Sequence, residues 1–432
     1  MIVMGYKVDK DALRQVIIDQ QSTGLPDNFV SRTLYFHLED YFTSDECVIL
    51  TGVRRCGKST LLQYLRSLQS EKNYYLNFDD DRLASFTIED FQTLFTLFIE
   101  LFGEQKYFYF DEIQNIPEWE RFVRRLHDSR KKIFITGSNA TMLSRELGTR
   151  LTGRYIQLEI YPFSFIDFLR FKNYPVKKTL SHLSTSDRAL LKKEFNEYRE
   201  FGGFPEYILS KNKQRLIDLH ESILYRDIMI RHKVVNERTF KILALYLASN
   251  IGKTMTFNSL KSMLSIKSST TIAEYCYYIQ NSFLITLVTK FDFSLKKQVN
   301  TAKKIYYIDL AMASVVGFRT SQDYGRFLEN LVFLELKRRG YKEIFYHAEK
   351  HECAFIVTDK HQVIMAIQVT QFIAPHNQDR EIAGLIEAIK KYSPPTVLLL
   401  TEDQETTLIH EQYSIQLLPV WKWLLQPDSS TL

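Results

Sequence analysis

One short stretch of this 432-residue chain constrains its fold more than any other. GVRRCGKST, residues 52–60, satisfies the pattern G-x-x-x-x-G-K-[ST] and lies between the apolar run CVIL and the helix-like segment STLLQYLRSL. The fixed glycines allow backbone N–H groups to converge on phosphate oxygens. The order of strand, glycine loop and helix also brings the positive end of the helix dipole to the phosphates. The pattern therefore predicts an α/β sheet that binds a nucleotide.

The residue types in this loop indicate how it would hold ATP and Mg²⁺. Lys58 would neutralise the β- and γ-phosphates, and the Ser59 hydroxyl would ligate Mg²⁺. The complete set of predicted nucleotide-binding residues is Gly52, Val53, Arg54, Arg55, Cys56, Gly57, Lys58, Ser59 and Thr60. A chance match to the pattern is expected in about one or two chains of this length in a hundred. An ordinary strand–turn–helix corner is therefore the less favoured interpretation.

A phosphate loop needs acidic groups nearby, and the segment KYFYFDEIQ supplies them. Its apolar run, residues 107–110, is typical of a central parallel strand and ends in Asp111 and Glu112. Ligands of open α/β sheets bind at the carboxyl ends of the strands. We therefore predict that Asp111 holds Mg²⁺ through water and that Glu112 polarises the attacking water. Taken alone, the two acids could equally be a helix N-cap pair, but the phosphate loop favours the catalytic interpretation.

Two further segments contribute candidates. KKIFITGSN, residues 131–139, is predicted to be another strand ending at the same sheet edge, where Asn139 could orient the attacking water. Arg150 and Arg154 then flank a glycine-containing turn. In an oligomeric ATPase such an arginine can reach a neighbour's γ-phosphate and stabilise charge in the transition state. We expect one of the two to be functional and the other to be a surface arginine. Strands alternate with helices throughout, which indicates a doubly wound parallel sheet.

The segments GVRRCGKSTLL, LNFDDDRL, FDEIQ, ITGSNATML and LTGRYIQLEIYPFSFIDFL resemble the AAA-type domain of a large family of prokaryotic ATPases. The resemblance implies an AAA+ core over residues 1–165, with a helical lead-in and with Asn139 as its polar sensor. It also implies a C-terminal domain of poorly defined function. FGGFPEYIL and LYRDIMIRHKV are similar to the linking helical segment of these proteins, which we place at 166–234.

A winged helix is predicted over residues 235–315. Three helical segments are followed by two expected strands around a basic loop, LKKQVNTAKK. In DNA-binding winged modules the basic hairpin tracks phosphates. The candidate phosphate contacts are Lys296, Lys297, Lys303 and Lys304. The alternative is a module that contacts only protein, in which these are ordinary loop lysines.

The last segment, 316–432, resembles the restriction-nuclease-like α/β fold attached to these ATPases. An active fold of that kind carries a helical glutamate, a strand aspartate and an E-x-K motif. Glu329 matches the glutamate, but Ala354 replaces the aspartate, and Gln368 and Thr370 replace the E-x-K. The resemblance therefore implies a catalytically degenerate domain without a metal site of this type. Its remaining candidates for contact with a phosphate backbone or another protein are Arg338, Arg339 and Lys342.

Composition limits the possible partners. A net charge of +5 is mildly basic and well short of a nucleic-acid-binding arm. The four cysteines lie far apart without a CxxC pair, which argues against a zinc cluster and fits a cytoplasmic protein. The N-terminus lacks a signal-peptide pattern. No uncharged apolar stretch reaches the roughly 18 residues of a membrane span.

We therefore expect a homo-oligomeric AAA+ ATPase that hydrolyses ATP with Mg²⁺ and couples hydrolysis to DNA, including branched DNA. The alternative is a regulatory switch, in which the nucleotide state controls binding of a partner protein. An ATP-dependent nuclease is disfavoured by Ala354, Gln368 and Thr370.

Overall fold

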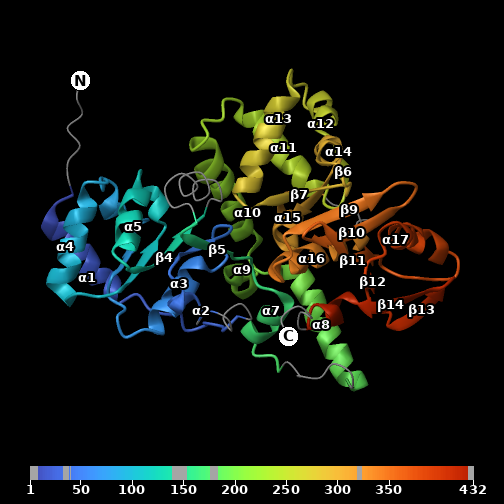
Figure 1. The fold of residues 1–432 in the computed structure, drawn as a ribbon, viewed down its shortest axis with the longest axis horizontal. Coiled ribbons are helices and arrows are strands. Elements are labelled where there is room, and N and C mark those ends of the chain that lie inside the picture. The colour runs from blue at the N-terminus through green and yellow to red at the C-terminus, as the bar shows by residue number, and fades with distance from the viewer. Residues whose placement is uncertain are drawn as a thin grey trace. The chain divides into compact units, whose positions relative to one another are not determined.

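The protein divides into two compact units in this computed structural model (Figure 1). The structure describes residues 8–32, 38, 40–138, 153–175, 183–318 and 324–426. The N-terminal unit runs to Tyr161 and includes a short segment at 281–283, and the C-terminal unit comprises the remaining residues from Pro162 onward. Asn139 and Arg150, two of the predicted site residues, lie outside the described residues.

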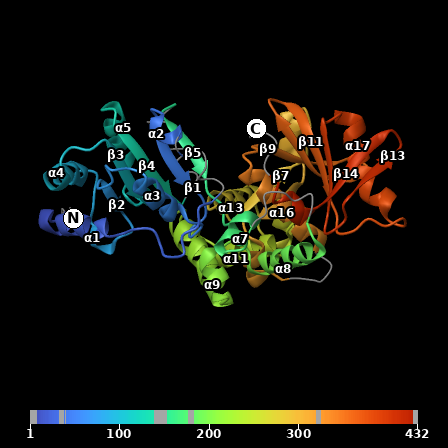
Figure 2. The same ribbon diagram turned by 90° about the horizontal axis from the view of Figure 1, so that it is seen from below.

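The N-terminal unit is built on a five-stranded sheet of order β2-β3-β4-β1-β5, in which every pairing is parallel. Figure 2 shows its arrows side by side. The strands are β1 (Cys47–Thr51), β2 (Tyr75–Asn77), β3 (Tyr107–Asp111), β4 (Lys132–Gly137) and β5 (Tyr155–Glu159). All residues of β1 and β4 are buried, so both faces of the sheet are covered. The predicted doubly wound parallel sheet is confirmed.

Helices and short turns precede β1 and connect the strands. They are α1 (Lys10–Gln21), α2 (Asp40–Thr43), α3 (Lys58–Ser67), η2 (Asp81–Leu83), α4 (Asp90–Phe102), η3 (Ile113–Asn115) and α5 (Trp119–Asp128). Aromatic residues dominate the core between helices and sheet. Tyr74 stacks on Phe98 with ring centroids 4.7 Å apart, and Phe91 stacks on Phe122 at 4.4 Å. Such offset aromatic pairs stabilise a core beyond their buried area, so the loops at the strand ends stand on a rigid base.

The C-terminal unit begins with a group of helices. They are α7 (Phe165–Phe171), α8 (Thr185–Phe201), α9 (Pro205–Ser210), α10 (Lys213–Ser222) and the π-helix η4 (Ile223–Ile230). The chain reverses after α8 at Gly202, whose φ of 66° favours glycine. A Cβ on Gly202 would come within 2.4 Å of the Asp309 carboxylate.

The next segment has the helix and strand order of a winged helix. It comprises α11 (Glu237–Ser249), β6 (Thr254–Met255), α12 (Phe257–Met263), α13 (Ser269–Asn281), β7 (Ile285–Thr289), α14 (Leu295–Asn300), β8 (Lys303–Tyr307) and α15 (Leu310–Val316). The strands form an antiparallel sheet of order β6-β8-β7. The expectation of a basic loop between the last two strands is wrong, because the short helix α14 occupies that position. Asp292 helps to start this helix by accepting a hydrogen bond from Ser294 N at 2.8 Å.

A six-stranded sheet of order β13-β14-β12-β11-β10-β9 completes the C-terminal unit. Its elements are α16 (Tyr324–Arg338), β9 (Glu343–Ala348), β10 (Glu352–Asp359), β11 (Gln362–Val369), α17 (Gln378–Tyr392), β12 (Thr396–Thr401), β13 (Thr406–His410), β14 (Tyr413–Pro419) and α18 (Val420–Trp423). The sheet is mixed: β9, β10 and β11 are antiparallel, whereas β12 is parallel to both β11 and β14. Within the part of the chain that is described, no helix is long and apolar enough to cross a membrane.

Candidate nucleotide site

The phosphate loop connects β1 to α3 and requires glycine at both ends. Gly52 has φ 144° and Gly57 has φ 101°, values that residues with a Cβ rarely adopt. A Cβ on Gly52 would also lie only 2.1 Å from the carbonyl oxygen of Ile160. Gly57 is the N-cap of α3, so the loop stands directly on the positive end of that helix. The loop therefore has the backbone shape and the electrostatic setting of an anion site.

Lys58 brings a positive charge into this loop. Its side chain is buried, and Nζ donates hydrogen bonds of 3.1 Å to the carbonyl oxygens of Gly52 and Val53. Neutral carbonyl groups are weaker partners for an ammonium group than a phosphate is. The lysine is thus held inside the loop by contacts that a bound phosphate can replace.

The other loop residues divide between the core and the surface. Val53 and Cys56 are fully buried, whereas Arg55 is exposed. Arg54 lies 4.0 Å from the carboxylate of Asp79, and Thr60 is half-buried in the first turn of α3. Buried side chains anchor the loop and leave its polar backbone to face a ligand.

Asp111 and Ser59 converge beside the loop. Asp111 ends β3 and is 1% exposed, and its Oδ1 accepts a hydrogen bond from Ser59 Oγ at 3.1 Å. Burial, helped by the neighbouring charge of Glu112, raises the pKa of Asp111 to about 6. A buried carboxylate of this kind is stabilised by a cation. A serine hydroxyl and one carboxylate suit Mg²⁺, which usually keeps several waters and binds substrate phosphates besides one or two protein ligands.

Glu112 follows Asp111 in a strained backbone conformation. Its φ of 51° lies in the left-handed region, which is uncommon for a residue with a side chain and recurs at active sites. Its carboxylate is half-buried and accepts a hydrogen bond from the Gln114 side chain. Glu112 is therefore accessible enough to meet water and is oriented by Gln114, as a general base would need to be.

Thr136 ties the two acids together and was not identified from the sequence. Its hydroxyl donates to Asp111 Oδ1 and accepts a hydrogen bond from the backbone N–H of Glu112 at 2.9 Å. The pairing of β3 with β4 explains its position. Phe110 pairs with Ile135, so the next residues of the two strands, Asp111 and Thr136, lie side by side. A polar residue at the matching position of the neighbouring strand is the feature to look for.

Arg154 lies at the opposite edge of the sheet from the phosphate loop. Its carbonyl oxygen accepts from the N–H of Cys47, the first residue of β1, whereas the loop follows the last residue of that strand. The five residues of β1 span about 16 Å. The Arg154 side chain is 39% exposed and pairs with Asp128 at 2.7 Å. The structure therefore does not bring Arg154 to the phosphate loop of its own chain.

Lys304 is not available to contact phosphate, and this part of the wing prediction is wrong. Its side chain is 1% exposed, and Nζ lies 2.7 Å from Glu329 and 2.5 Å from Glu352. Lys303 is half-buried and donates to the carbonyl oxygen of Val299 at 2.9 Å. Tertiary packing buries Lys304 because β8 is a buried strand, whereas Lys303 is occupied by backbone carbonyl groups at the end of α14. Of the four candidates in the wing, Lys296 and Lys297 are exposed.

Arg338 and Arg339 also serve the fold rather than a surface, so their prediction as phosphate or protein contacts is wrong. Arg338 is largely buried and donates to the carbonyl oxygens of Pro162 and Phe163 at 3.2 Å. Arg339 donates to the carbonyl oxygen of Trp423 at 2.8 Å and stacks on its ring. Lys342 is exposed and keeps its candidate role.

The residues that replace the nuclease motif form hydrogen bonds within the C-terminal unit. The backbone N–H of Ala354 donates to the Gln368 side chain at 2.9 Å, and the Thr370 hydroxyl donates to Glu381 at 2.9 Å. Glu329, the one matching acid, is buried against the Lys304 ammonium group. The polar groups of this region are thus engaged in contacts with the protein itself.

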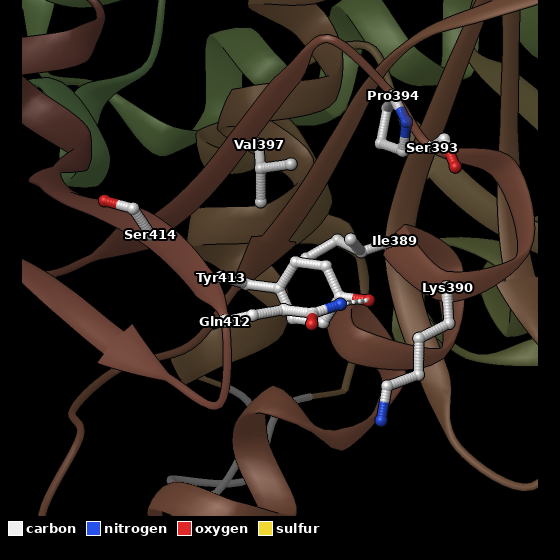
Figure 3. Close-up of a pocket in the computed structure, with 8 residues that line it drawn as sticks. All are labelled: Ile389, Lys390, Ser393, Pro394, Val397, Gln412, Tyr413 and Ser414. Carbon is white, nitrogen blue, oxygen red and sulfur yellow. Dashed lines mark hydrogen bonds between the residues drawn. The ribbon is translucent and has the colours of Figure 1, made fainter.

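A separate cavity of 340 Å³ lies in the C-terminal sheet, and Figure 3 shows its lining. The side chains come from the end of α17, the start of β12 and the turn between β13 and β14: Ile389, Lys390, Ser393, Pro394, Val397, Gln412, Tyr413 and Ser414. Lys390 also forms a 2.9 Å ion pair with Glu411. None of the motif residues lines this cavity, so the candidate site is the phosphate loop.

Comparison with family profiles agrees with this location. A profile described as an AAA domain matches residues 44–169, which include the phosphate loop, both acids and β5. A second profile, for a domain of unknown function (DUF8612), matches residues 192–323, which include the helices from α9 to α15.

Two curated proteins are similar over almost their whole length. An uncharacterized protein of Methanocaldococcus jannaschii is 34% identical over 438 residues, which cover 97% of this chain and 96% of that protein. An uncharacterized protein of Haemophilus influenzae is 32% identical over 415 residues, which cover 93% and 98%. The succession of an N-terminal and a C-terminal unit is therefore shared with both.

Solved structures give weaker matches. The Aeropyrum pernix ORC1 protein in complex with DNA has 10% identity and a TM-score of 0.29, covering 70% of this chain and 95% of that chain. AMPPCP-bound DnaA from Aquifex aeolicus has 15% identity and a TM-score of 0.26, covering 60% and 90%. RuvB of Thermotoga maritima has 16% identity and a TM-score of 0.28, covering 64% of this chain and 93% of that chain. TM-scores this low say nothing about what this chain binds.

Proposed function

The chain belongs to one family with the Methanocaldococcus jannaschii and Haemophilus influenzae proteins and carries an AAA domain, and we propose that it is an ATPase. The observation that carries the proposal is the convergence of Ser59, Asp111 and Glu112 beside a glycine loop that holds Lys58 at a helix N-terminus. Each group has the chemistry that one part of phosphoryl transfer to water requires.

In the proposed reaction the loop N–H groups and Lys58 bind the β- and γ-phosphates. Ser59 would ligate Mg²⁺ and Asp111 would hold it through water, and the ion would supply neutralisation of the phosphate charge. Glu112 accepts the proton of the attacking water. Gln114 and Thr136 hold Glu112 in position by hydrogen bonds to its carboxylate and its backbone N–H, respectively. Asn139 is proposed to orient this water from the end of β4.

We propose that the arginine finger comes from a neighbouring subunit of a homo-oligomer. Arg154 supports this because it lies at the sheet edge remote from its own loop and is exposed. Its partner Asp128 can release it easily, since surface ion pairs contribute about 0–1 kcal/mol. Arg150 is the other candidate for the same role.

For the C-terminal unit we propose contact with DNA through the winged helix, at Lys296 and Lys297 of α14, with Lys342 as a further candidate. Exposed lysines on a wing can position a protein on phosphates without reading bases. Nuclease activity is not part of the proposal, because Ala354, Gln368 and Thr370 cannot supply the carboxylate and amine of that chemistry.

A second candidate function is a nucleotide-dependent switch that binds a partner protein. The observation that favours it is the apolar surface of the same wing. Phe293, Leu295 and Val299 are 75%, 73% and 60% exposed, respectively. Apolar side chains gathered on one exposed segment are more typical of a protein contact than of a phosphate contact.

An ATPase assay with purified protein tests these proposals. Turnover should require Mg²⁺, and the Lys58→Ala variant should show none. Stimulation by duplex, single-stranded or branched DNA over a DNA-free control would support the DNA proposal. Unchanged turnover on all three DNA forms would favour the protein partner. Absence of turnover and of nucleotide binding in the wild-type protein would overturn the ATPase proposal.

A further inference from the structure

The phosphate loop contacts Ile160, one residue before the point where the chain passes into the C-terminal unit. Cys56 lies in the middle of the loop, and its thiol donates to the carbonyl oxygen of Ile160 at 3.1 Å. Burial raises the pKa of this thiol, so it stays protonated and can donate. Gly52, at the start of the loop, approaches the same carbonyl group so closely that no Cβ fits between them. The start and the middle of the loop are therefore both packed against the Ile160 carbonyl group.

Arg32 bridges the loop and this end of the unit directly. It precedes β1 and is 4% exposed. Nη1 donates to the carbonyl oxygen of Cys56 at 3.2 Å, and Nη2 donates to the carbonyl oxygen of Tyr161 at 2.7 Å. A planar guanidinium group can hold two acceptors at a fixed spacing, which an ammonium group cannot do. The side chain of Arg32 thus holds the carbonyl groups of Cys56 and Tyr161 at a fixed spacing.

The contact of Arg32 with the Cys56 carbonyl group orients the peptide whose N–H group a phosphate would contact. In a trans peptide the C=O of Cys56 and the N–H of Gly57 point in opposite directions from one rigid plane. Arg32 holds the C=O end, so the N–H end is directed to the other side. A phosphate accepting from that N–H would polarise the peptide and strengthen its bond to Arg32. Nucleotide binding and the Arg32 contact therefore reinforce each other.

The chain beyond Tyr161 is equally well held within the C-terminal unit. Pro162 and Phe163 open this unit, and Arg338 donates to the carbonyl oxygens of both at 3.2 Å. Tyr198 Oη also donates to the carbonyl oxygen of Phe163 at 2.9 Å. The chain is thus held by hydrogen bonds on each side of the junction, within each unit separately.

We propose that Arg32 is a positioning residue that couples occupancy of the phosphate loop to the junction at Tyr161 and Pro162. The proposal rests on the proposed nucleotide binding and extends it to the route by which the C-terminal unit senses the nucleotide. Arg32 orients the Gly57 N–H for phosphate through the Cys56 carbonyl, and it passes the resulting shift to Tyr161.

Hydrogen exchange measured by mass spectrometry on the full-length chain tests this coupling. Wild-type protein is compared with and without Mg²⁺ and a non-hydrolysable ATP analogue. At an analogue concentration of 100 times its Kd, exchange of loop amides should slow by up to about 100-fold. Protection should appear both in residues 52–60 and in residues 160–165. The Arg32→Lys variant, which keeps the charge without the fork, should retain protection in the loop and lose it at the junction.

Arg66→Lys is the matched control. Arg66 is also buried in the N-terminal unit and donates to backbone carbonyl groups, those of Lys72 at 2.6 Å and Thr23 at 3.0 Å. It does so at the far end of α3, so its replacement should leave the junction response intact. Arg32→Lys should also weaken nucleotide affinity about tenfold, as expected for loss of one charged hydrogen bond, whereas Arg66→Lys should not. Arg32→Gln is the second variant if Arg32→Lys does not fold.

The outcomes separate this inference from the proposed function. A wild-type loop that shows no protection by the analogue overturns nucleotide binding, and the coupling with it. A protected wild-type loop with an unaffected junction overturns the coupling alone. Junction protection of wild-type size in both Arg32 variants overturns the role of Arg32. Loop protection in every variant, with a junction response lost only on changing Arg32, is the result that supports it.

Discussion

At the scale of single residues, the candidate site is organised around the buried carboxylate of Asp111. Ser59 and Thr136 donate to it, and the neighbouring Glu112 carries a second negative charge. Hydrogen bonds favour the ionised form, but burial opposes it more strongly, so the pKa of Asp111 rises to about 6. A bound cation would therefore stabilise the ionised carboxylate of Asp111, and holding a cation is the role proposed for this residue.

The first residue-scale prediction separates binding from chemistry. Lys58→Ala should abolish nucleotide binding, because the phosphates lose the cation that the loop holds. Glu112→Gln should bind as the wild type does and show no turnover, because a carboxamide cannot accept the proton of water. Binding of a fluorescent nucleotide and release of phosphate measure the two effects. Wild-type turnover of Glu112→Gln would exclude Glu112 as the base.

The second residue-scale prediction concerns pH. The folded-state pKa of Asp111, about 6, lies above its ordinary value of 3.8. In metal-free protein, ionisation of Asp111 therefore costs stability as pH rises from about 4 through 6, by roughly 3 kcal/mol at most. Mg²⁺ binds the ionised form, so its affinity should fall as pH decreases through about 6. Titrations of Mg²⁺-dependent nucleotide binding between pH 5 and pH 8 measure this, and Asp111→Asn should remove the pH dependence. An equal dependence in Asp111→Asn would assign it to another group.

At the scale of elements, burial decides which charged residues act on the surface. Strand β8 carries Lys304 into contact with Glu329 of α16 and Glu352 of β10, so one ammonium group links three elements of the C-terminal unit. Burial raises the pKa of Glu329, although Lys304 opposes that shift. Helix α14, by contrast, leaves its lysines and its apolar residues exposed.

Removing the buried ammonium group should destabilise the C-terminal unit. Lys304→Met leaves the buried carboxylate of Glu329 without its cation, which typically costs about 3–5 kcal/mol. The additional change Glu329→Gln should recover part of this loss, because no uncompensated charge then remains. Urea denaturation monitored by a C-terminal-unit signal gives the free energies of unfolding. Lys297→Met, on the exposed helix α14, is the control and should shift stability by less than about 0.5 kcal/mol.

The proposed contact of Lys296 and Lys297 with DNA predicts how DNA affinity depends on salt concentration. Each lysine that contacts a phosphate contributes a slope of about −0.9 to log affinity against log salt on duplex DNA. The double change of Lys296 and Lys297 to Ala should therefore flatten the slope by about two units, with little dependence on sequence. Lys303→Ala should have no such effect, since Lys303 donates to backbone carbonyl groups. An unchanged slope in the double variant would favour the partner protein, whose binding should then depend on Phe293 and Leu295.

At the scale of the whole molecule, the proposed reaction calls for an arginine at the γ-phosphate, and Arg154, the candidate among the described residues, lies away from the loop of its own chain. The phosphate loop lies at the carboxyl edge of the parallel sheet and Arg154 at the amino edge. As the proposed arginine finger, Arg154 would act on the nucleotide of another subunit. This arrangement is what supports the proposed homo-oligomer, in which transition-state charge is stabilised across a subunit boundary.

Mixing experiments test the trans arginine. Arg154→Ala should lower turnover far more than nucleotide affinity, since such a finger can contribute about 10³–10⁵ in rate. Mixing it with Lys58→Ala should restore part of the activity, through interfaces that combine an intact loop with an intact arginine. Asp128→Ala breaks the same surface ion pair but keeps the arginine, so its turnover should stay normal. If subunits are shown to exchange and no rescue occurs, Arg154 has no trans role, and Arg150→Ala is tested in the same way.

The parallel sheet and the phosphate loop follow from the sequence alone, because each depends on a local pattern. Continuous apolar runs indicate strands buried on both faces. The shape and charge of the loop are specified within a few residues by Gly52, Gly57 and Lys58. The acids at the end of β3 are found for the same reason. Arg32 and Thr136 carry no such pattern, since their partners lie on segments distant in the chain or on a neighbouring strand.

Tertiary structure also decided which basic residues reach solvent. Lys304 and Arg338 look like surface residues in the sequence, yet burial beside carboxylates or backbone carbonyl groups gives them internal partners. A charge enters the interior only where acceptors from several elements meet, and that meeting exists only after the sheets have packed. The sequence by itself determined the glycine loop, the acids at the end of β3 and the parallel sheet. The packed fold alone decided which charges are buried and which distant residues contact the loop.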